Sequence, residues 1–169
     1  MIKQLCDQKN NQINKVRVFK ETDLGQVKNL IDKTIDTSYA YYPTEFINYW
    51  KNNVHSKDSI LKDALEGFTL VAELNKEIVG TGTLVGSEIL RVFVNPRFQR
   101  KGIGKKIMSL LEEHARENGV DAVYLTSTPV SKSFYDSFGY QTIERKIFSE
   151  ENSQKVGYFR MTKNLKNSG

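Results

Sequence analysis

The sequence predicts an α+β fold of α/β/α layers, with a mixed, mostly antiparallel sheet of about seven strands and helices on both faces. Two observations carry this prediction. Segments with strand periodicity and segments with helix periodicity alternate along the chain in the order β α α(α) β β β α β α β β. In the middle, the strands expected over 68–74 and 77–85 are joined by Asn75-Lys76, a tight turn that favours antiparallel pairing.

The N-terminal part is expected to hold a flexible tail over 1–14, which is polar and rich in Asn and Gln, before a single domain over 15–169. The valines of "KVRVFK" (15–20) alternate with cations, which predicts a short strand. The segment after it has apolar residues at helical spacing, and Thr22 or Asp23 is placed to cap that helix. Its inner face is expected to hold Leu24, Val27, Leu30, Ile31 and Ile35.

An aromatic segment follows, "DTSYAYYPTEFINYWKNN" (36–53). Pro43 and Thr44 are typical of a helix start, and the aromatic residues after them lie at helical spacing. "SKDSILKDALEG" (56–67) predicts a further short helix that ends at Gly67. The aromatic side chains either cover the sheet or line a substrate pocket. The residues considered for the pocket are Tyr39, Tyr41, Tyr42 and Trp50.

In the C-terminal part of the chain, over 88–165, short strands and helices are expected to alternate. A helix is expected over 103–118, ended by Gly119, with Ile103, Ile107, Leu110, Leu111 and His114 on its inner face. His114 is therefore interpreted as a packing side chain, whereas His55, in a polar linker, is interpreted as solvated. The other expected elements are strands over 88–94, 121–128, 140–148 and 155–165 and a short helix over 130–138.

The amino-acid composition favours a soluble globular protein and argues against several other classes. A hydrophobic fraction of 38% and a charged fraction of 27% are typical of a soluble globular chain, and no segment approaches the roughly 20 apolar residues of a membrane helix. The single cysteine, Cys6, excludes an intrachain disulfide, and two distant histidines offer no metal site. We therefore expect a cytoplasmic protein without a metal or membrane contact. The net charge of +5 is modest, and no basic stripe with interleaved aromatics supports nucleic-acid binding.

Positive charge instead gathers in "RFQRKGIGKK" (97–106), where five cations surround two glycines. Gly104-Lys105 lacks the earlier glycine and the Ser or Thr of a P-loop, and Ile107 stands where a dinucleotide-binding fingerprint needs Gly or Ala. The pattern that fits is a strand, then Gln99-x-x-Gly102-x-Gly104, then a helix. The first amides of such a helix converge on an anion, and glycines admit a pyrophosphate closely. The alternatives are a solvated basic turn and, more distantly, a nucleic-acid contact.

Together with "SKSFYDSFGY" (131–140), this pattern resembles the GCN5-related N-acetyltransferase (GNAT) superfamily, most strongly from Phe68 to Tyr140. The resemblance implies the GNAT-like acyl-CoA N-acyltransferase fold, with acetyl-CoA as cosubstrate. It places the thioester arm on the backbone of Val92, Phe93 and Val94. It places the pyrophosphate on the loop formed by Gln99, Arg100, Lys101, Gly102, Ile103, Gly104 and Lys105.

The resemblance also implies two catalytic residues. Glu88 lies eleven positions before Gln99, the offset of a glutamate base in the histone-acetylating branch, and a carboxylate there suits general-base work directly or through water. The alternative is that Glu88 caps the turn after Gly86. Tyr135 stands where the family commonly has a tyrosine near the coenzyme sulfur, and its phenol suits protonation of the leaving thiolate. The alternative for Tyr135 is packing as a core aromatic.

These observations predict acetyl transfer from acetyl-CoA to a primary amine. Direct attack in a ternary complex is expected, because Cys6 lies in the tail and no Ser/His/Asp arrangement is evident. The alternative is a non-catalytic CoA-binding sensory or regulatory module on the same fold. The acceptor is a small molecule or a protein amine, and a homodimer through the last strands is a further expectation. Thr128 stands where the family often has an asparagine that contacts the coenzyme.

Overall fold

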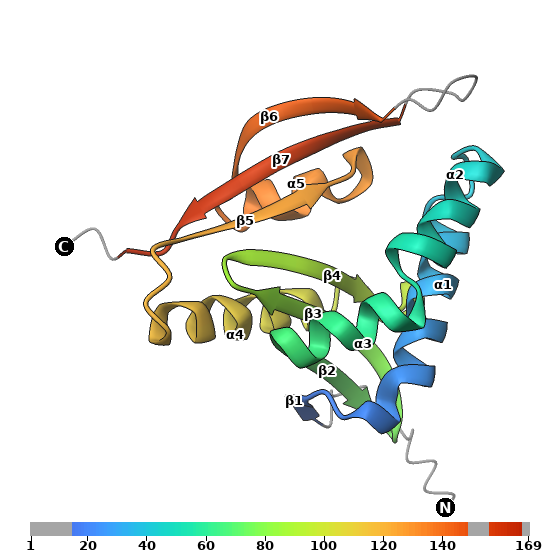
Figure 1. Ribbon diagram of the computed structural model, residues 1–169, viewed down its shortest axis with the longest axis horizontal. Coiled ribbons are helices and arrows are strands. Elements are labelled where there is room, and N and C mark those ends of the chain that lie inside the picture. Colours follow the sequence, from blue (N-terminus) through green and yellow to red (C-terminus); the bar gives the residue numbers. More distant parts are fainter. Residues whose placement is uncertain (1–14, 149–155, 167–169) are drawn as a thin grey trace, which may run out of the picture.

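A computed structural model describes residues 15–148 and 156–166, which form one seven-stranded sheet with helices on both faces (Figure 1). The strand order is β1-β2-β3-β4-β5-β7-β6, and every neighbouring pair is antiparallel except β4 and β5. This arrangement confirms the predicted fold class. The expected tail over 1–14 lies outside the described residues. The strands are β1 Lys15–Val18, β2 Phe68–Leu74, β3 Glu77–Val85, β4 Glu88–Val94, β5 Ala122–Ser127, β6 Gln141–Phe148 and β7 Val156–Asn164.

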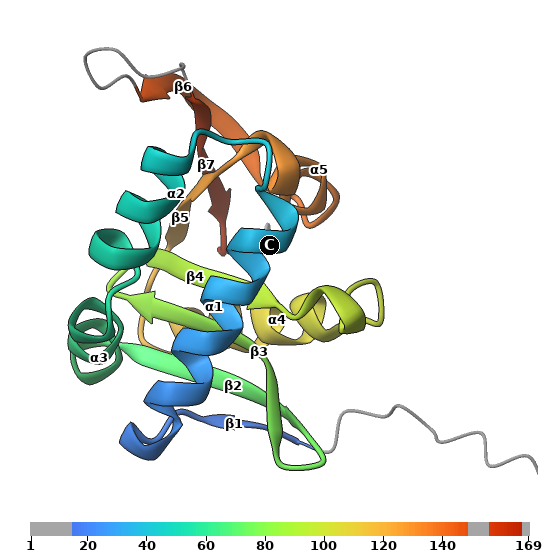
Figure 2. The ribbon, with the colours of Figure 1, turned by 90° about the vertical axis from the view of Figure 1, so that its right-hand side faces the viewer.

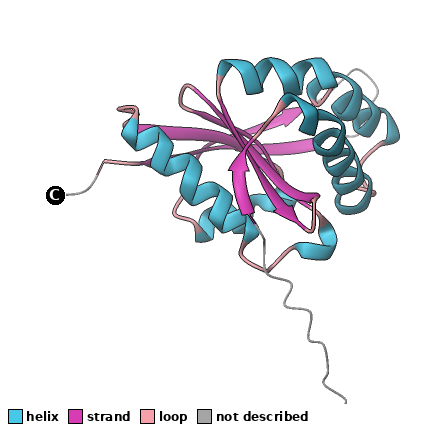
Figure 3. Cartoon of the chain, turned by 90° about the horizontal axis from the view of Figure 1, so that it is seen from below, coloured by secondary structure: helices cyan, strands magenta, loops and turns pink. Residues whose placement is uncertain are grey.

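Two helical layers enclose the sheet (Figures 2 and 3). One cluster of buried apolar side chains joins α1 and α3 to the sheet, and a second joins α4 and α5 to its other face. The alternation of β2 explains this, because Leu70 and Ala72 belong to the α4 cluster and Val71 between them belongs to the α1 cluster. The helices are α1 Leu24–Ser38, α2 Thr44–Tyr49, α3 Lys57–Glu66, α4 Ile103–Glu117 and α5 Pro129–Ser137, with short turns at η1 Glu21–Asp23, η2 Trp50–Val54 and η3 Pro96–Phe98.

Two glycines of β3 let α4 lie close to the sheet. A Cβ on Gly80 would come within 2.8 Å of Ile103 Cγ2, and one on Gly82 within 2.6 Å of Ile107 Cγ2. Both distances are shorter than van der Waals contact, so a side chain at either position would push the helix away. The sequence "GTG" in β3 therefore allows a short distance between α4 and the sheet, and this positions the start of α4.

The start of α1 differs from the prediction. Neither Thr22 nor Asp23 caps the helix; a 3-10 turn at Glu21–Asp23 precedes α1, and no side chain caps its first amides. The Asp23 carboxylate instead accepts the backbone N–H of Lys20 at 2.7 Å and pairs with Arg17 at 2.7 Å. The Arg17 guanidinium lowers the pKa of Asp23 and also binds Glu73 on β2. The carboxylate thus ties the chain between β1 and α1 to the sheet.

The buried face of α4 is also rotated relative to the prediction. Leu110 and His114 are only half-buried, whereas Met108, Glu112 and Ala115 are buried. His114 stacks on Phe68 with ring centroids 3.8 Å apart, which confirms its packing role. Charged side chains are rarely buried without a partner, so the sequence alone does not predict that Glu112 lies on the inner face of α4. Its carboxylate accepts from Tyr140 Oη at 2.9 Å and from Lys163 Nζ at 2.8 Å, and so joins α4 to β7.

Candidate functional site

The parallel strands β4 and β5 separate soon after they meet (Figure 1). The two strands are in register only at Glu88 and Tyr124. Further along β4, Arg91 has a left-handed φ of 53° where the pairing with β3 shifts register. A bulge of this kind bends a strand and strengthens its local twist. The last residues of β4 are therefore turned away from β5 and leave one backbone edge of β4 open.

The open edge of β4 carries polar backbone groups that no other described strand pairs. The N–H of Asn95 donates to Val79 O on β3 at 2.8 Å. Since successive residues of a strand point their polar atoms to opposite sides, the N–H and C=O groups of Val94 and Val92 face away from β3. Gln99 Nε2 donates to Val94 O at 3.0 Å and so takes one of these groups. The others form a short row of strand donors and acceptors for an extended ligand.

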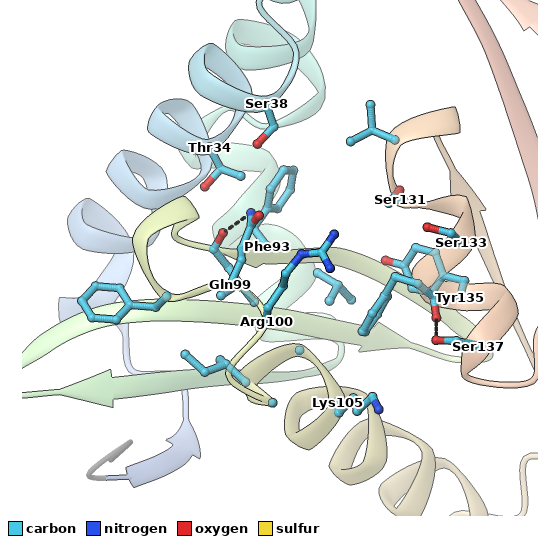
Figure 4. A pocket seen from close by; sticks show the side chains of 18 of the residues that line it. Thr34, Ser38, Phe93, Gln99, Arg100, Lys105, Ser131, Ser133, Tyr135 and Ser137 are labelled. Carbon is cyan, nitrogen blue, oxygen red and sulfur yellow. Dashed lines mark hydrogen bonds between the residues drawn. The ribbon is translucent and has the colours of Figure 1, made fainter. Parts of the chain in front are cut away.

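A cavity of about 620 Å³ lies along this edge, between the ends of α1, β4, α4 and α5 (Figure 4). Figure 4 shows Arg100 on the loop and Tyr135 on α5 at opposite sides of it. Its lining includes nearly all of the residues expected to bind coenzyme: Val92, Phe93, Val94, Gln99, Arg100, Gly102, Ile103, Gly104 and Lys105. Lys101 is not part of this lining, and its Nζ lies 5.4 Å from the centroid of Phe98.

The loop before α4 has left-handed residues and free helix amides at the cavity wall. Arg100 has a φ of 60° and Gly102 a φ of 84°. The first helical hydrogen bond runs from Lys106 N to Gly102 O at 3.0 Å, so the N–H groups of residues 103–105 have no partner one turn earlier. An ideal Cβ on Gly102 has no atom within 4 Å, whereas one on Gly104 would lie 3.2 Å from Phe134 Cζ. Three amides and the helix dipole therefore favour a phosphate group at this point.

Tyr39 and Tyr135 line both this cavity and a neighbouring one of about 460 Å³. Both rings are 7% exposed, and burial raises the pKa of each phenol. Tyr39 Oη accepts from Thr128 Oγ1 at 3.3 Å, so the threonine positions this tyrosine. The residues that line both cavities are Tyr39, Val92, Phe93, Ser131 and Tyr135. A ligand in either cavity can thus reach the open edge of β4.

Glu88 lies apart from these shared lining residues. It begins β4, and among the described residues it is not part of the lining of either cavity. Its Oε2 accepts from Arg160 Nη1 at 2.7 Å, and its other oxygen pairs with Nη2 of the same guanidinium. The carboxylate raises the pKa of Arg160. The structure therefore brings Tyr135, but not Glu88, to the edge where the thioester is expected.

A family model described as an acetyltransferase (GNAT) domain matches residues 35–165, which include every lining residue of the second cavity and all but Thr34 of the first. The chain belongs to the GNAT acetyltransferase family. Comparison with curated protein sequences gives no match. Among solved structures, the GCN5-related N-acetyltransferase from Rhodopseudomonas palustris is similar with a TM-score of 0.79 at 20% identity, covering 90% of this chain and 96% of that one.

Two further GNAT structures were solved with coenzyme. The paia N-acetyltransferase from Thermoplasma acidophilum, in complex with coenzyme A, has a TM-score of 0.72 at 22% identity and covers 89% of this chain and 98% of that one. Salmonella typhimurium yncA with its cofactor acetyl-CoA has a TM-score of 0.68 at 17% identity, covering 92% and 95%. At these identities the likeness shows the shared fold.

The second cavity of this GNAT domain is largely aromatic. Of the aromatic residues considered for the pocket, Tyr39 and Trp50 line it, together with Phe46 and Tyr49, whereas Tyr41 and Tyr42 do not. Tyr42 stacks on Tyr39 instead, with centroids 5.6 Å apart. Tyr39, Tyr42 and Trp50 pack with sheet residues in the α1 cluster, so part of the segment does cover the sheet. That the cavity lined by Tyr39 and Trp50 binds substrate stays a prediction.

His55 is the clearest error of the sequence interpretation. It is 6% exposed rather than solvated, and it lies between Trp50 and Phe93 with ring centroids 5.5 and 5.2 Å away. Neither ring nitrogen has a hydrogen-bond partner among the described residues. Burial, and then the positive charges of Arg91 and Lys28, lower the pKa of His55 to about 3. The local sequence carries no signal for this contact, because Phe93 comes from β4.

The described part of this GNAT domain offers no metal centre. Within residues 15–148 and 156–166, no three His, Cys, Asp or Glu side chains cluster closely enough to hold a metal ion. No helix in the same ranges is long and apolar enough to cross a membrane.

Proposed function

We propose that the protein is an acyl-CoA-dependent N-acetyltransferase that moves an acetyl group from acetyl-CoA to a primary amine by direct attack in a ternary complex. The junction of the two cavities at the open edge of β4 carries this proposal. A coenzyme in the first cavity and an amine in the second meet there. No covalent enzyme intermediate is required, because both ligands reach the same strand edge.

In this proposal the main chain binds the coenzyme. The amides of residues 103–105 hold the pyrophosphate, and Arg100 and Lys105 add positive charge beside it. The free polar groups of Val92 and Val94 pair with the pantetheine arm as a neighbouring strand would. A backbone N–H of this edge also stabilises the oxyanion, and it needs no reorganisation because β3 holds the strand in place.

Tyr135 is proposed to protonate the leaving thiolate. The amine nitrogen forms a bond to the thioester carbon, the carbon–sulfur bond breaks, and the sulfur takes the phenolic proton. The nitrogen releases one proton to water, and water returns a proton to the phenolate. Burial raises the pKa of Tyr135, so the phenol still carries its proton at neutral pH. We expect Tyr135→Phe to lower kcat about 100-fold while the Kd of acetyl-CoA stays nearly constant.

The assay measures thiol release from acetyl-CoA with a panel of amines, and calorimetry measures coenzyme binding. Tyr41→Phe is the matched control, because Tyr41 is 66% exposed and lines neither cavity. An unchanged kcat in Tyr135→Phe would show that another group protonates the sulfur. Coenzyme binding without transfer to any amine would favour the alternative, a CoA-binding regulatory module.

Glu88 stays a predicted general base. Because its carboxylate is paired with Arg160 away from the junction, it would act through ordered water rather than directly. We expect Glu88→Gln to lower kcat about tenfold or more at neutral pH and to lose less at high pH, where the free amine is already abundant. Equal losses at both pH values would remove Glu88 from proton transfer and leave it a structural partner of Arg160.

A further inference from the structure

We propose that the second cavity selects acceptor amines with one positive charge on an apolar or aromatic body, and that it disfavours polycations. This inference rests on the proposed function, because it assigns the second cavity to the acceptor. It concerns the chemical class of the acceptor, which the family alone leaves open.

The wall of the second cavity is a connected aromatic surface. Trp50 meets Tyr39 edge-on with centroids 5.0 Å apart and lies 5.4 Å from Phe46. The opposite wall is made by apolar residues of β4, Ile89 and Leu90, and by Val156 at the start of β7. A ligand that fills about 460 Å³ between these walls must bury mostly carbon surface.

The charges of this cavity cancel within the protein. Among the described lining residues, Asp63 is the only carboxylate and Arg91 the only cation. Arg91 Nη1 is bonded to Asp63 Oδ2, and its Nη2 donates to Val54 O at 3.0 Å. His55 stays neutral. No acidic side chain of the described lining is therefore left to pair with an ammonium group of the ligand.

These walls discriminate between amines by their number of charges. A single ammonium can rest on the aromatic faces by cation–π attraction until it loses its proton for the reaction. Each further ammonium group would be desolvated without forming an ion pair with a carboxylate, and burying an unpaired charge costs free energy. The apolar part of an amine gains binding free energy when it is buried against the same aromatic and apolar walls. Monoamines with apolar or aromatic bodies therefore fit this cavity better than polyamines or aminoglycosides do.

The experiment measures amine binding by calorimetry on protein saturated with coenzyme A, so it does not depend on turnover. We expect 2-phenylethylamine to bind at least about tenfold more tightly than spermidine or tobramycin, which is about 1.4 kcal/mol. Equal or tighter binding of either polycation would overturn the inference, and so would a failure of 2-phenylethylamine to bind. Transfer to spermidine together with its tight binding would overturn the inference alone and leave the proposed function intact.

A pair of charge variants distinguishes the effect of a carboxylate at the cavity from the effect of the protein's net charge on spermidine binding. Val54 lines the second cavity and is 40% exposed, so Val54→Glu places a carboxylate at the cavity without burying it. Leu65→Glu is the control, because Leu65 is 76% exposed and outside the cavity. We expect Val54→Glu to tighten spermidine binding about threefold or more and Leu65→Glu to leave it unchanged. Equal effects of the two variants would show that charge at long range, not this cavity, excludes polycations.

Discussion

Gly102→Glu is expected to weaken acetyl-CoA binding at least about 100-fold, or about 2.8 kcal/mol. Gly102 lies in the left-handed region, with a φ of 84°, immediately before the first unpaired amides of α4. Its missing Cβ faces open space, so a glutamate side chain would meet no protein atom at its Cβ and would extend into the anion site. There its carboxylate would occupy the amides in place of the pyrophosphate and repel the remaining phosphate.

Gly86→Glu is the matched control for this variant. Gly86 has a φ of 59°, an ideal Cβ there also meets nothing within 4 Å, and the residue lies in the turn between β3 and β4 outside both cavities. It also places a non-glycine residue in the left-handed region and adds the same charge, but at a position outside the anion site. Calorimetric titration compares both variants with the wild type. Dephospho-CoA, which keeps the pyrophosphate, should bind the wild type and lose affinity in Gly102→Glu. Equal losses in the two variants, or none in Gly102→Glu, would place the pyrophosphate elsewhere.

The candidate coenzyme site could be described from the sequence because its parts are neighbours in the chain. The end of β4, the glycine loop and the first turn of α4 all lie within residues 92–105, and their function depends on backbone geometry that local sequence determines. Tyr135 needed the family resemblance, since helical spacing alone also suits a packing residue. The lining of the cavity by α1, through Thr34 and Ser38, has no local signal.

The contacts that the sequence does not indicate concern side chains whose environment comes from distant segments. Glu88 is bound by Arg160, 72 positions later, which no local pattern of β4 indicates. Glu112 looks like a solvated helix residue until Lys163 and Tyr140 are placed against it. His55 follows a polar stretch, yet Phe93 from β4 covers its ring. Periodicity predicts which side of a helix or strand is buried. The partner that stabilises a buried charge comes from a distant segment, and only the tertiary fold determines it.

Acid is expected to destabilise this protein through His55. In the unfolded chain its pKa is near the ordinary 6.5, and in the fold it is lowered to about 3. Below pH 6.5 the unfolded state therefore binds a proton that the folded state does not, and stability is lost as pH falls. At about 1.36 kcal/mol per pH unit, lowering the pH from 7.5 to 5 should cost about 2 kcal/mol of unfolding free energy from this residue.

Denaturant unfolding of the wild type and of His55→Phe at pH 7.5 and 5 measures this effect. Phenylalanine keeps a ring between Trp50 and Phe93 and removes both unpaired nitrogens. Carboxylates such as Asp23, whose lowered pKa starts from an ordinary value of 3.8, lose their contribution only below about pH 5 and are present in both proteins, so the difference between the two isolates His55. Parallel pH dependence in the two proteins would show that the imidazole is protonated in the fold. A flatter dependence in His55→Phe would mean that the second cavity keeps a neutral base at its wall down to mildly acidic pH. The cavity then gains no charge that would repel an incoming ammonium.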